Sequence, residues 1–268
     1  METARGLEGL EASDAPVFVV VGVFDGLHLG HAYLLDHLVR EAAARGARPL
    51  VITFDHHPDE ILTGSAPPLL CDPAERLELL AAAGVASTVV VHFDQALRET
   101  TYEAFVAGIA ARVPVAGFLM TPDAAFGYRR AGTPDALAAL GREHGFDVVV
   151  VPPFELDGTP VRSSEVREAI AAGDLDRAAR LLGRPHGVVG EAAERPGAPG
   201  SRVSFQLPVA LPPEGEYRTR VAAAKDAPRG GLAGMGRDGR TAVVAGRELL
   251  LPDDRVAGRV RVELLAAS

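Results

Sequence analysis

The stretch VFVVVGVFDGLHLGHAYLL, from Val17 to Leu35, joins three patterns that together decide the fold. Val17–Phe24 is a continuous apolar run rich in valine, which is typical of a central parallel strand buried on both faces. Leucines and alanines then recur at helical spacing. Between the strand and the helix lies a short loop with two glycines, an aspartate, and the histidines His28 and His31. The stretch therefore predicts a strand, a tight loop and a helix in immediate succession.

The same alternation of strand and helix continues along the first two-thirds of the chain. Further apolar strands are predicted at 49–54, 87–93, 115–120 and 146–154. Helices are predicted between and after them at 72–83, 101–112, 133–145, 164–172 and 174–182, with Asp72, Thr101, Thr133 and Ser164 expected at their N-termini. Such alternation implies right-handed crossovers and an α/β fold with a doubly wound parallel sheet. Ligands bind such sheets beyond the carboxyl ends of the strands, where the histidine loop begins.

The pattern changes close to Arg184. RPGAPG at 195–200 predicts a turn or loop, and 227–239 is rich in glycine and predicts another loop. Short alternating runs at 202–208, 216–223, 240–246, 247–252 and 258–266 predict antiparallel strands of a small barrel or sandwich. We therefore predict two domains, an α/β domain over 1–185 and a smaller antiparallel β-barrel domain over 186–268.

Composition and charge exclude several classes of protein. The chain has 268 residues and a formal net charge of -9, whereas a nucleic-acid binder normally needs a basic face. Apolar runs stay shorter than the roughly 18 residues of a membrane span, and the first 16 residues lack the apolar core of a signal peptide. Cys71 is the single cysteine, which excludes an intrachain disulfide and a thiolate metal cluster. We expect a cytoplasmic protein with no nucleic-acid or membrane partner, and the sequence leaves its oligomeric state open.

The histidine loop has the features of an anion site. A glycine-rich loop that enters a helix leaves backbone N–H groups and the positive end of the helix dipole facing a ligand, which favours phosphate. His28 and His31 could donate to phosphate oxygens, and Gly26 and Gly30 would allow a close approach. The loop is neither a P-loop nor a dinucleotide fingerprint, because it lacks their lysine and their glycine spacing. The alternative interpretation is two surface histidines beside a helix start.

The loop also resembles a known family. Gly22–His31 is similar to the G-x-F-D-G-[VL]-H-x-G-H signature of bacterial bifunctional riboflavin kinase/FAD synthetases, and His-x-Gly-His marks the wider nucleotidylyltransferase superfamily. Three further motifs follow in the family's order. Thr53, Phe54, His57 and Pro58 resemble T-F-x-x-H-P; Phe126, Gly127, Arg130 and Gly132 resemble F-G-x-x-R-x-G; and VRSSEVR, with Ser163, Ser164 and Arg167, resembles I-S-S-T-x-I-R. The resemblance covers roughly residues 5 to 185 and implies a Rossmann-like nucleotidylyltransferase domain.

The chemistry that the resemblance implies is adenylyl transfer from ATP to FMN, with Mg²⁺ accompanying ATP. It implies that His28 and His31 hold the ATP phosphates and that Ser163, Ser164 and Arg167 form a clamp for the β- and γ-phosphates. We take His28, His31 and Arg167 as candidate catalytic residues and name no protein ligand for Mg²⁺. For the serines and the arginine, the alternative is a simple helix cap with a surface arginine.

Further binding positions follow from the same resemblance. Phe54 and Phe126 would line a slot for the flavin ring, although an aromatic side chain at a strand end is often plain core. Asp123 would lie close to the flavin phosphate, and Asp25 is expected to orient the loop by accepting backbone N–H bonds. The full set of candidate binding residues is Gly22, Phe24, Asp25, Gly26, Gly30, Phe54, His57, Pro58, Asp123, Phe126, Arg130, Ser163 and Ser164.

Two departures from the family pattern qualify the prediction. TPDAAFG at 121–127 has Thr121 and Ala124 where the family has glycine and phenylalanine, which would loosen the acceptor pocket. In the C-terminal part, QLPVA at 206–210 replaces the Pro-Thr-Ala-Asn that serves the kinase's Mg–ATP site, so we predict a degenerate barrel without riboflavin kinase activity. The leading hypothesis is a monofunctional FMN adenylyltransferase. The alternatives are transfer to another phosphorylated acceptor or modified flavin, and a non-catalytic module that binds flavin or nucleotide.

Overall fold

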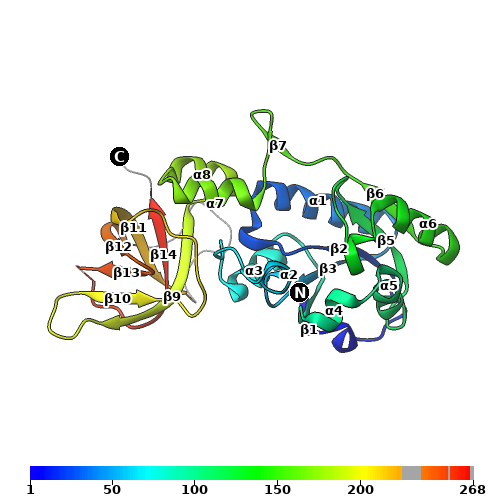
Figure 1. Ribbon diagram of the computed structural model, residues 1–268, viewed down its shortest axis with the longest axis horizontal. Coiled ribbons are helices and arrows are strands. Elements are labelled where there is room, and N and C mark those ends of the chain that lie inside the picture. Colours follow the sequence, from blue (N-terminus) through cyan, green and yellow to red (C-terminus); the bar gives the residue numbers. More distant parts are fainter. Residues whose placement is uncertain (225–236, 253, 266–268) are drawn as a thin grey trace. The chain divides into compact units, whose positions relative to one another are not determined.

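The structure is a computed structural model that describes residues 1–224, 237–252 and 254–265, and it forms two compact units (Figure 1). The unit that we call the sheet unit comprises Met1–Phe24, Gly30–Pro67 and Leu80–Glu155. The unit that we call the barrel unit comprises Asp25–Leu29, Pro68–Leu79 and Leu156–Ser268. The segment Asp25–Leu29, which contains His28, is thus counted with the later part of the chain, whereas His31 belongs to the sheet unit. The domain boundary at residue 185 stays a prediction about sequence modules.

The sheet unit contains the predicted doubly wound parallel sheet. Its six strands lie in the order β1-β4-β3-β2-β5-β6, and every pair is parallel. The chain builds outward from β2 to one side and then crosses to the other side with β5, so the two central strands mark the switch point of the fold. The strands are β1 (Glu2–Arg5), β2 (Val17–Val21), β3 (Arg48–Phe54), β4 (Ser87–Val91), β5 (Val115–Met120) and β6 (Asp147–Val150).

Helices connect these strands, as the crossover pattern predicts. They are α1 (Leu29–Ala44), α2 (Pro58–Thr63), α3 (Pro73–Ala82), α4 (Gln95–Glu99), α5 (Tyr102–Ala110) and α6 (Pro134–His144), with 3-10 turns η1 (Leu7–Gly9), η2 (Asp25–Leu27) and η3 (Tyr128–Arg130). The predicted caps of three helices are confirmed. Asp72, Thr101 and Thr133 each accept a hydrogen bond from a backbone N–H in the first turn.

Valine, isoleucine, leucine and phenylalanine side chains make up most of the core of the sheet unit. Val19 of β2 pairs with Leu50 of β3 and with Phe118 of β5, and none of the three side chains is more than 1% exposed. This burial on both faces explains why the strands read as continuous apolar runs in the sequence.

After β6 the chain forms a short hairpin, β7 (Glu155–Leu156) and β8 (Thr159–Pro160), and then, within the barrel unit, α7 (Ser163–Ala171) and α8 (Leu175–Leu182). Six antiparallel strands then close a barrel in the order β10-β13-β12-β11-β14-β9, with β9 bonded to β10. They are β9 (His186–Glu194), β10 (Ser201–Ser204), β11 (Gly215–Ala223), β12 (Arg237–Ala245), β13 (Glu248–Leu251) and β14 (Gly258–Leu265). The prediction of a second, antiparallel β-barrel is confirmed.

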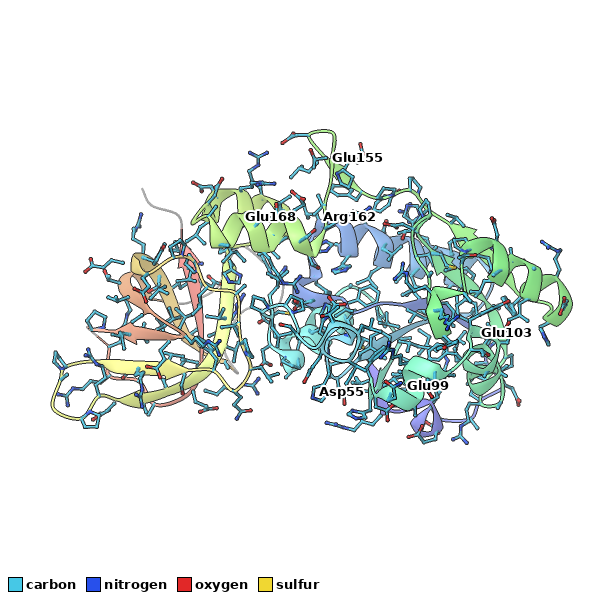
Figure 2. All side chains as sticks on the ribbon, viewed as in Figure 1. Asp55, Glu99, Glu103, Glu155, Arg162 and Glu168 are labelled. Carbon is cyan, nitrogen blue, oxygen red and sulfur yellow. The ribbon has the colours of Figure 1, made fainter. Side chains whose placement is uncertain are left out.

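Several local predictions are wrong. Ser164 is not an N-cap, because α7 already begins at Ser163, and Arg162, labelled in Figure 2, occupies the cap position without capping the helix through its side chain. Strand β2 ends at Val21 rather than Phe24, and the strands expected at 87–93 and 146–154 end early. The predictions missed β1, β9, α2 and α4. Most of the loop expected at 227–239 lies outside the described residues, and its last three residues belong to β12.

Among the described residues, no helix combines the length and the hydropathy that crossing a bilayer requires.

Candidate active site

The carboxylate of Asp25 is the centre of the loop between β2 and α1. Asp25 is 2% exposed and accepts hydrogen bonds from the backbone N–H groups of Leu70, at 3.0 Å, and Cys71, at 3.2 Å. Its Oδ2 also lies 2.5 Å from Nη2 of Arg167. The expected role of Asp25 in accepting backbone N–H bonds is therefore confirmed, and the loop is fixed to a second segment 45 residues later in the chain.

Arg167 reaches the loop from α7. Its Nε donates to the carbonyl oxygen of Pro68 at 2.8 Å, while Nη2 binds Asp25. The hydroxyl of Ser163 donates to the backbone carbonyl of Asp25 at 3.3 Å. Arg167 lies in the second turn of its helix, not at the first turn as a cap at Ser164 had implied. Two of its nitrogens are thus committed to the protein, so the structure gives Arg167 a positioning role and leaves its catalytic role a prediction.

Arg184 is a contact to the same loop that sequence analysis missed. Its Nη2 donates to the carbonyl of Gly26 at 2.6 Å and its Nη1 donates to the carbonyl of Leu27 at 3.1 Å. Arg184 follows the end of α8 by two residues, where the sequence indicates only a change of domain. No local pattern in the sequence indicates this contact, because it joins residues 157 positions apart in the chain.

His28 lies in this cationic and dry environment. Its side chain is 4% exposed, and burial, together with the positive charges of Arg184 and Arg167, lowers its pKa to about 4. The imidazole is therefore neutral at pH 7 and offers one donor and one acceptor rather than a positive charge. A bound anion would favour the protonated form and raise this pKa.

Gly26 is required for packing within the protein. Its φ is +77°, and a Cβ there would lie 2.8 Å from Cβ of Leu70. Leu70 therefore makes a close approach to this glycine, and an approach of a ligand to the Gly26 backbone stays a prediction. Gly30, the other glycine, lies in the first turn of α1.

The sheet unit contains His31 and Phe24. His31 belongs to the first turn of α1, and its ring centroid lies 5.1 Å from that of Phe24. Phe24 is 1% exposed and has φ of +53°, a backbone conformation that is rare for a bulky residue. Phe24 is therefore core rather than ligand-facing, and its strained backbone marks the point where the chain turns out of the sheet.

A cavity of about 690 Å³ opens in the sheet unit at the switch point of the sheet. Its wall includes Gly22, which follows β2, and Met120, the last residue of β5. Five phenylalanines supply most of its aromatic surface, namely Phe54, Phe93, Phe105, Phe118 and Phe126. Arg98, Arg129 and Arg130 provide the cationic groups at the wall. A cavity of this size and composition suits a planar aromatic ligand that has an anionic end.

Candidate binding residues of the sheet unit divide into two groups. Gly22, Phe54, Pro58, Phe126 and Arg130 line the cavity, together with Ala124, which replaces a family phenylalanine. The other candidate binding residues of this unit, Phe24, Gly30, His57 and Asp123, do not line the cavity.

His57 and Asp123 contribute local structure instead. His57 caps α2, where its Nδ1 accepts a hydrogen bond from the backbone N–H of Asp59 at 3.2 Å. The carboxylate of Asp123 accepts from the hydroxyl of Thr121 at 2.8 Å, and its carbonyl accepts from Arg130 at 3.1 Å. Asp123 therefore helps to hold the arginine that lines the cavity.

Comparison with known proteins gives a consistent result. A family model described as FAD synthetase matches residues 10–165. The bifunctional riboflavin kinase/FMN adenylyltransferase of Pseudomonas fluorescens is 34% identical over 191 residues, which is 71% of this chain and 61% of that protein. The protein of the same name from Escherichia coli (strain K12) is 31% identical over 245 residues, which is 88% of this chain and 78% of that protein.

One solved structure is similar over the whole chain. The crystal structure of a macrolide-efflux protein from Streptococcus pneumoniae matches with a TM-score of 0.81 at 22% identity, covering 100% of this chain and 91% of that one. Similarity at this level of identity establishes the fold and no more.

Proposed function

Since the chain belongs to the FAD synthetase family, we propose that it is an FMN adenylyltransferase, which transfers AMP from ATP to FMN and releases pyrophosphate. The observation that supports this most strongly is the family match over 10–165, which includes both histidines of the loop and the two serines at the start of α7. The phenylalanine-lined cavity of the sheet unit supports the choice of a flavin as acceptor.

The reaction is a displacement at phosphorus. An oxygen of the FMN phosphate forms a bond to the α-phosphorus of ATP, and the bond from that phosphorus to the oxygen that bridges to the β-phosphate breaks. The attacking phosphate is already an anion, so the reaction needs no strong base and no covalent enzyme intermediate. Catalysis then depends on holding the two substrates in line and on stabilising the charge that develops on the transferring and leaving phosphates.

On the ATP side, the proposal uses the histidine loop. His28 and His31 would donate ring N–H groups to phosphate oxygens, and the hydroxyl of Ser164 would add a further donor. Because His28 is neutral when ATP is absent, it can gain a proton as phosphate charge approaches. Arg167 would act through Asp25, since it is bound to that carboxylate.

On the acceptor side, the proposal places the flavin ring in the cavity of the sheet unit. The five phenylalanines offer apolar surface to the ring, and Arg130, held by the carbonyl of Asp123, offers a cation for the phosphate of FMN. Ala124 leaves more room than a phenylalanine would, so the cavity would also admit flavins with larger ring substituents.

The residues of the loop do not form a ligand set for the Mg²⁺ that the family's substrate ATP implies. Asp25 is the single carboxylate of the segment Asp25–Leu29, and two backbone N–H groups and Arg167 already bind it. We therefore derive no step through a protein-bound Mg²⁺, and in this proposal the ion binds to the ATP phosphates and water.

The proposal also assigns no riboflavin kinase activity to the barrel. Support comes from Gln206–Ala210, which replace the motif that serves the kinase's Mg–ATP site in the family. With riboflavin and ATP as the substrates, FMN should not form. The appearance of FMN would show that the barrel is an active kinase.

The test of the transferase proposal is product formation. With ATP, Mg²⁺ and FMN, the chain should form FAD and pyrophosphate in equal amounts. His28→Gln and His31→Gln should each lower kcat/KM by about 100-fold or more, as expected when a group that stabilises developing charge is removed. His144→Gln, a change of an exposed histidine on α6, is the matched control and should leave the rate unchanged. Binding of both substrates by a folded protein without any FAD would contradict the proposal.

A further inference from the structure

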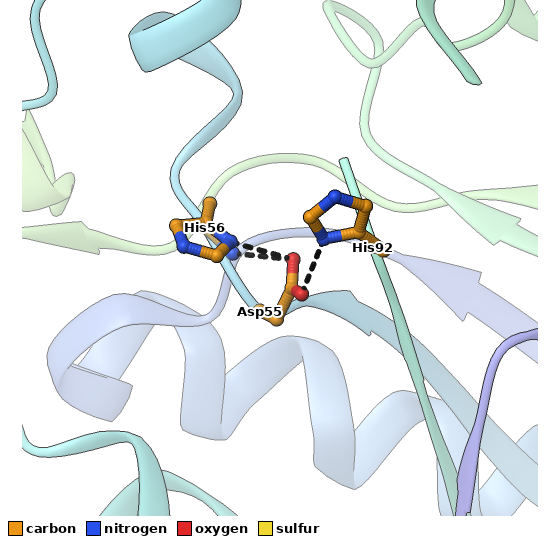
Figure 3. A group of neighbouring side chains, drawn as sticks. All are labelled: Asp55, His56 and His92. Atoms are coloured by element: carbon orange, nitrogen blue, oxygen red, sulfur yellow. Dashed lines mark hydrogen bonds and ion pairs between the residues drawn. The ribbon is translucent and has the colours of Figure 1, made fainter. Parts of the chain in front are cut away.

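Three side chains that the transferase proposal does not use meet beside the cavity of the sheet unit. Asp55 directly follows β3, and His92 directly follows β4, its parallel neighbour, so the two residues leave the sheet at the same edge. His56 is the next residue of the same loop. Figure 3 shows both imidazoles turned towards the one carboxylate.

The distances between their ligand atoms are short. Oδ2 of Asp55 lies 2.7 Å from Nδ1 of His92, and Oδ1 of Asp55 lies 3.1 Å from Nδ1 of His56. One ligand atom from each of the three residues lies within 4.8 Å of the other two. In a tetrahedral zinc site with bonds of about 2.0–2.1 Å, neighbouring ligand atoms are separated by about 3.3–3.4 Å, so movements of the two rings by rotation about their side-chain bonds would suffice.

The carboxylate is already fixed in place by the backbone. Oδ1 of Asp55 accepts hydrogen bonds from the backbone N–H of His56 at 2.8 Å and from that of Phe93 at 3.2 Å. These two hydrogen bonds orient the Asp55 carboxylate before any metal binds. Carboxylates that bind metal ions are commonly held by hydrogen bonds of this kind. The two imidazoles remain accessible, with side-chain exposures of 46% for His56 and 64% for His92.

From this geometry we propose that Asp55, His56 and His92 form a binding site for a divalent transition metal ion, of which Zn²⁺ fits best. Two imidazole nitrogens and one carboxylate oxygen are preferred ligands of Zn²⁺, and three protein ligands leave a fourth position open for water or an external ligand. The donor set disfavours Mg²⁺ and Ca²⁺, which prefer oxygen ligands. This site is therefore distinct in its chemistry from the Mg²⁺ that accompanies ATP.

The neighbours of the three ligands line the cavity. Phe54 precedes Asp55, Phe93 follows His92, and their rings contact each other edge to face with centroids 5.4 Å apart. A metal ion bound at this point would connect the ends of β3 and β4 and hold this wall of the cavity together. The site does not depend on the transferase proposal, because its ligands would bind a metal whatever the cavity holds.

The experiment is a titration of the full chain with Zn²⁺ in competition with a chromophoric chelator, in the absence of nucleotide. We expect one equivalent to bind, and we expect His92→Ala and His56→Ala each to weaken its binding at least tenfold. His144→Ala should bind Zn²⁺ like the unchanged chain. Co²⁺ used as the probe should give the intense visible absorption of a four-coordinate ion, and this band should be lost in His92→Ala.

Two results would overturn the proposal. One is unchanged Zn²⁺ affinity in both His56→Ala and His92→Ala, which would place the ion elsewhere. The other is an equal loss in His144→Ala, which would indicate scattered binding to surface histidines. Since both histidines are exposed, their alanine variants should unfold at the same temperature as the unchanged chain when no metal is present, and this control separates loss of the site from loss of the fold.

Discussion

The histidine loop and the phenylalanine-lined cavity differ in how their side chains are held. At the loop, Asp25 accepts hydrogen bonds from backbone N–H groups, and Arg167 and Arg184 donate to backbone carbonyl groups. The cavity has a volume of about 690 Å³ and a largely apolar wall, and its polar groups are three arginines together with Thr100 and Tyr128. A site whose polar groups are fixed by hydrogen bonds recognises one chemical group. In an apolar cavity, by contrast, the substitution of a few side chains can change which ligand binds. We therefore expect substitutions in the loop to affect folding and reaction together, and those in the cavity to affect mainly the acceptor.

The largest effect should follow Asp25→Ala. The change leaves the buried N–H groups of Leu70 and Cys71 and the guanidinium of Arg167 without their acceptor. Breaking a buried ion pair from one side costs about 3–5 kcal/mol, so the free energy of unfolding in urea should fall by that order.

The matched control is Asp36→Ala, which removes an exposed carboxylate paired with Arg40 one turn along α1. Exposed pairs of this kind contribute less than about 1 kcal/mol. Similar losses for Asp25→Ala and Asp36→Ala would show that the loop is not held by its buried carboxylate.

The next effect is a loss of stability in acid. Burial lowers the pKa of His28 and of His186 to about 4, whereas both titrate near 6.5 in the unfolded chain. Between pH 6.5 and 4 the unfolded chain therefore binds more protons, and the free energy of unfolding should fall as the pH falls, by up to about 3 kcal/mol for each histidine. Burial raises the pKa of Glu75, which acts in the opposite direction.

The variant His28→Gln isolates one of these contributions. Urea unfolding at several pH values from 7 to 4.5 should show a shallower dependence on pH for the variant than for the unchanged chain. Equal slopes would mean that His28 is protonated in the folded loop, and the neutral donor assigned to it would be wrong.

A smaller and more selective effect is expected from Phe126→Ala in the cavity. Phe126 packs against Phe105 and Phe118, with ring centroids 5.4 and 6.0 Å away. Its removal should raise the KM for FMN by about tenfold, equivalent to roughly 1.4 kcal/mol of lost apolar contact, and leave the KM for ATP within about twofold. Steady-state kinetics with each substrate varied in turn measures both values. An equal rise in both KM values would indicate a general loss of structure.

The smallest effect on stability is expected from substitutions of Thr133, which caps α6, and of Ser164, which was expected to cap α7. Thr133 caps α6 through its hydroxyl, so Thr133→Ala should cost about 1 kcal/mol of stability. Ser164 lies inside α7 and makes no such cap, so Ser164→Ala should change stability by less than about 0.5 kcal/mol. If Ser164 binds phosphate, its variant should still raise the KM for ATP. A destabilisation equal to that of Thr133→Ala would restore the capping role that sequence analysis predicted.

Much of the fold was predictable because its signals are local. The valine-rich run of β2, the apolar run of β3 and the caps Thr101 and Thr133 depend on neighbours in the chain, and the structure confirms them. Strand β9 was missed because its segment, His186–Glu194, contains glycines and alanines that pack only in a closed barrel. Strand β1 was missed because it is short and polar at the edge of its sheet.

The candidate site was likewise predictable where its signals are local and not where it depends on long-range contacts. The motif at Gly22–His31 identified the loop, but no local pattern indicates that Arg184 binds its carbonyls from 157 residues away. The packing of Leu70 against Gly26 was likewise not predictable, because Leu70 lies in a distant segment. Long-range contacts of this kind are decided by packing, which a single sequence does not display.

The central claim is that the α-phosphorus of ATP is transferred to FMN. The most direct measurement is to supply ATP labelled in turn at the α- and γ-phosphates and to follow the label into the products. The account predicts that α-label appears in FAD and γ-label in pyrophosphate, in equal amounts. Label from the γ-phosphate in a flavin, or FAD without α-label, would contradict it.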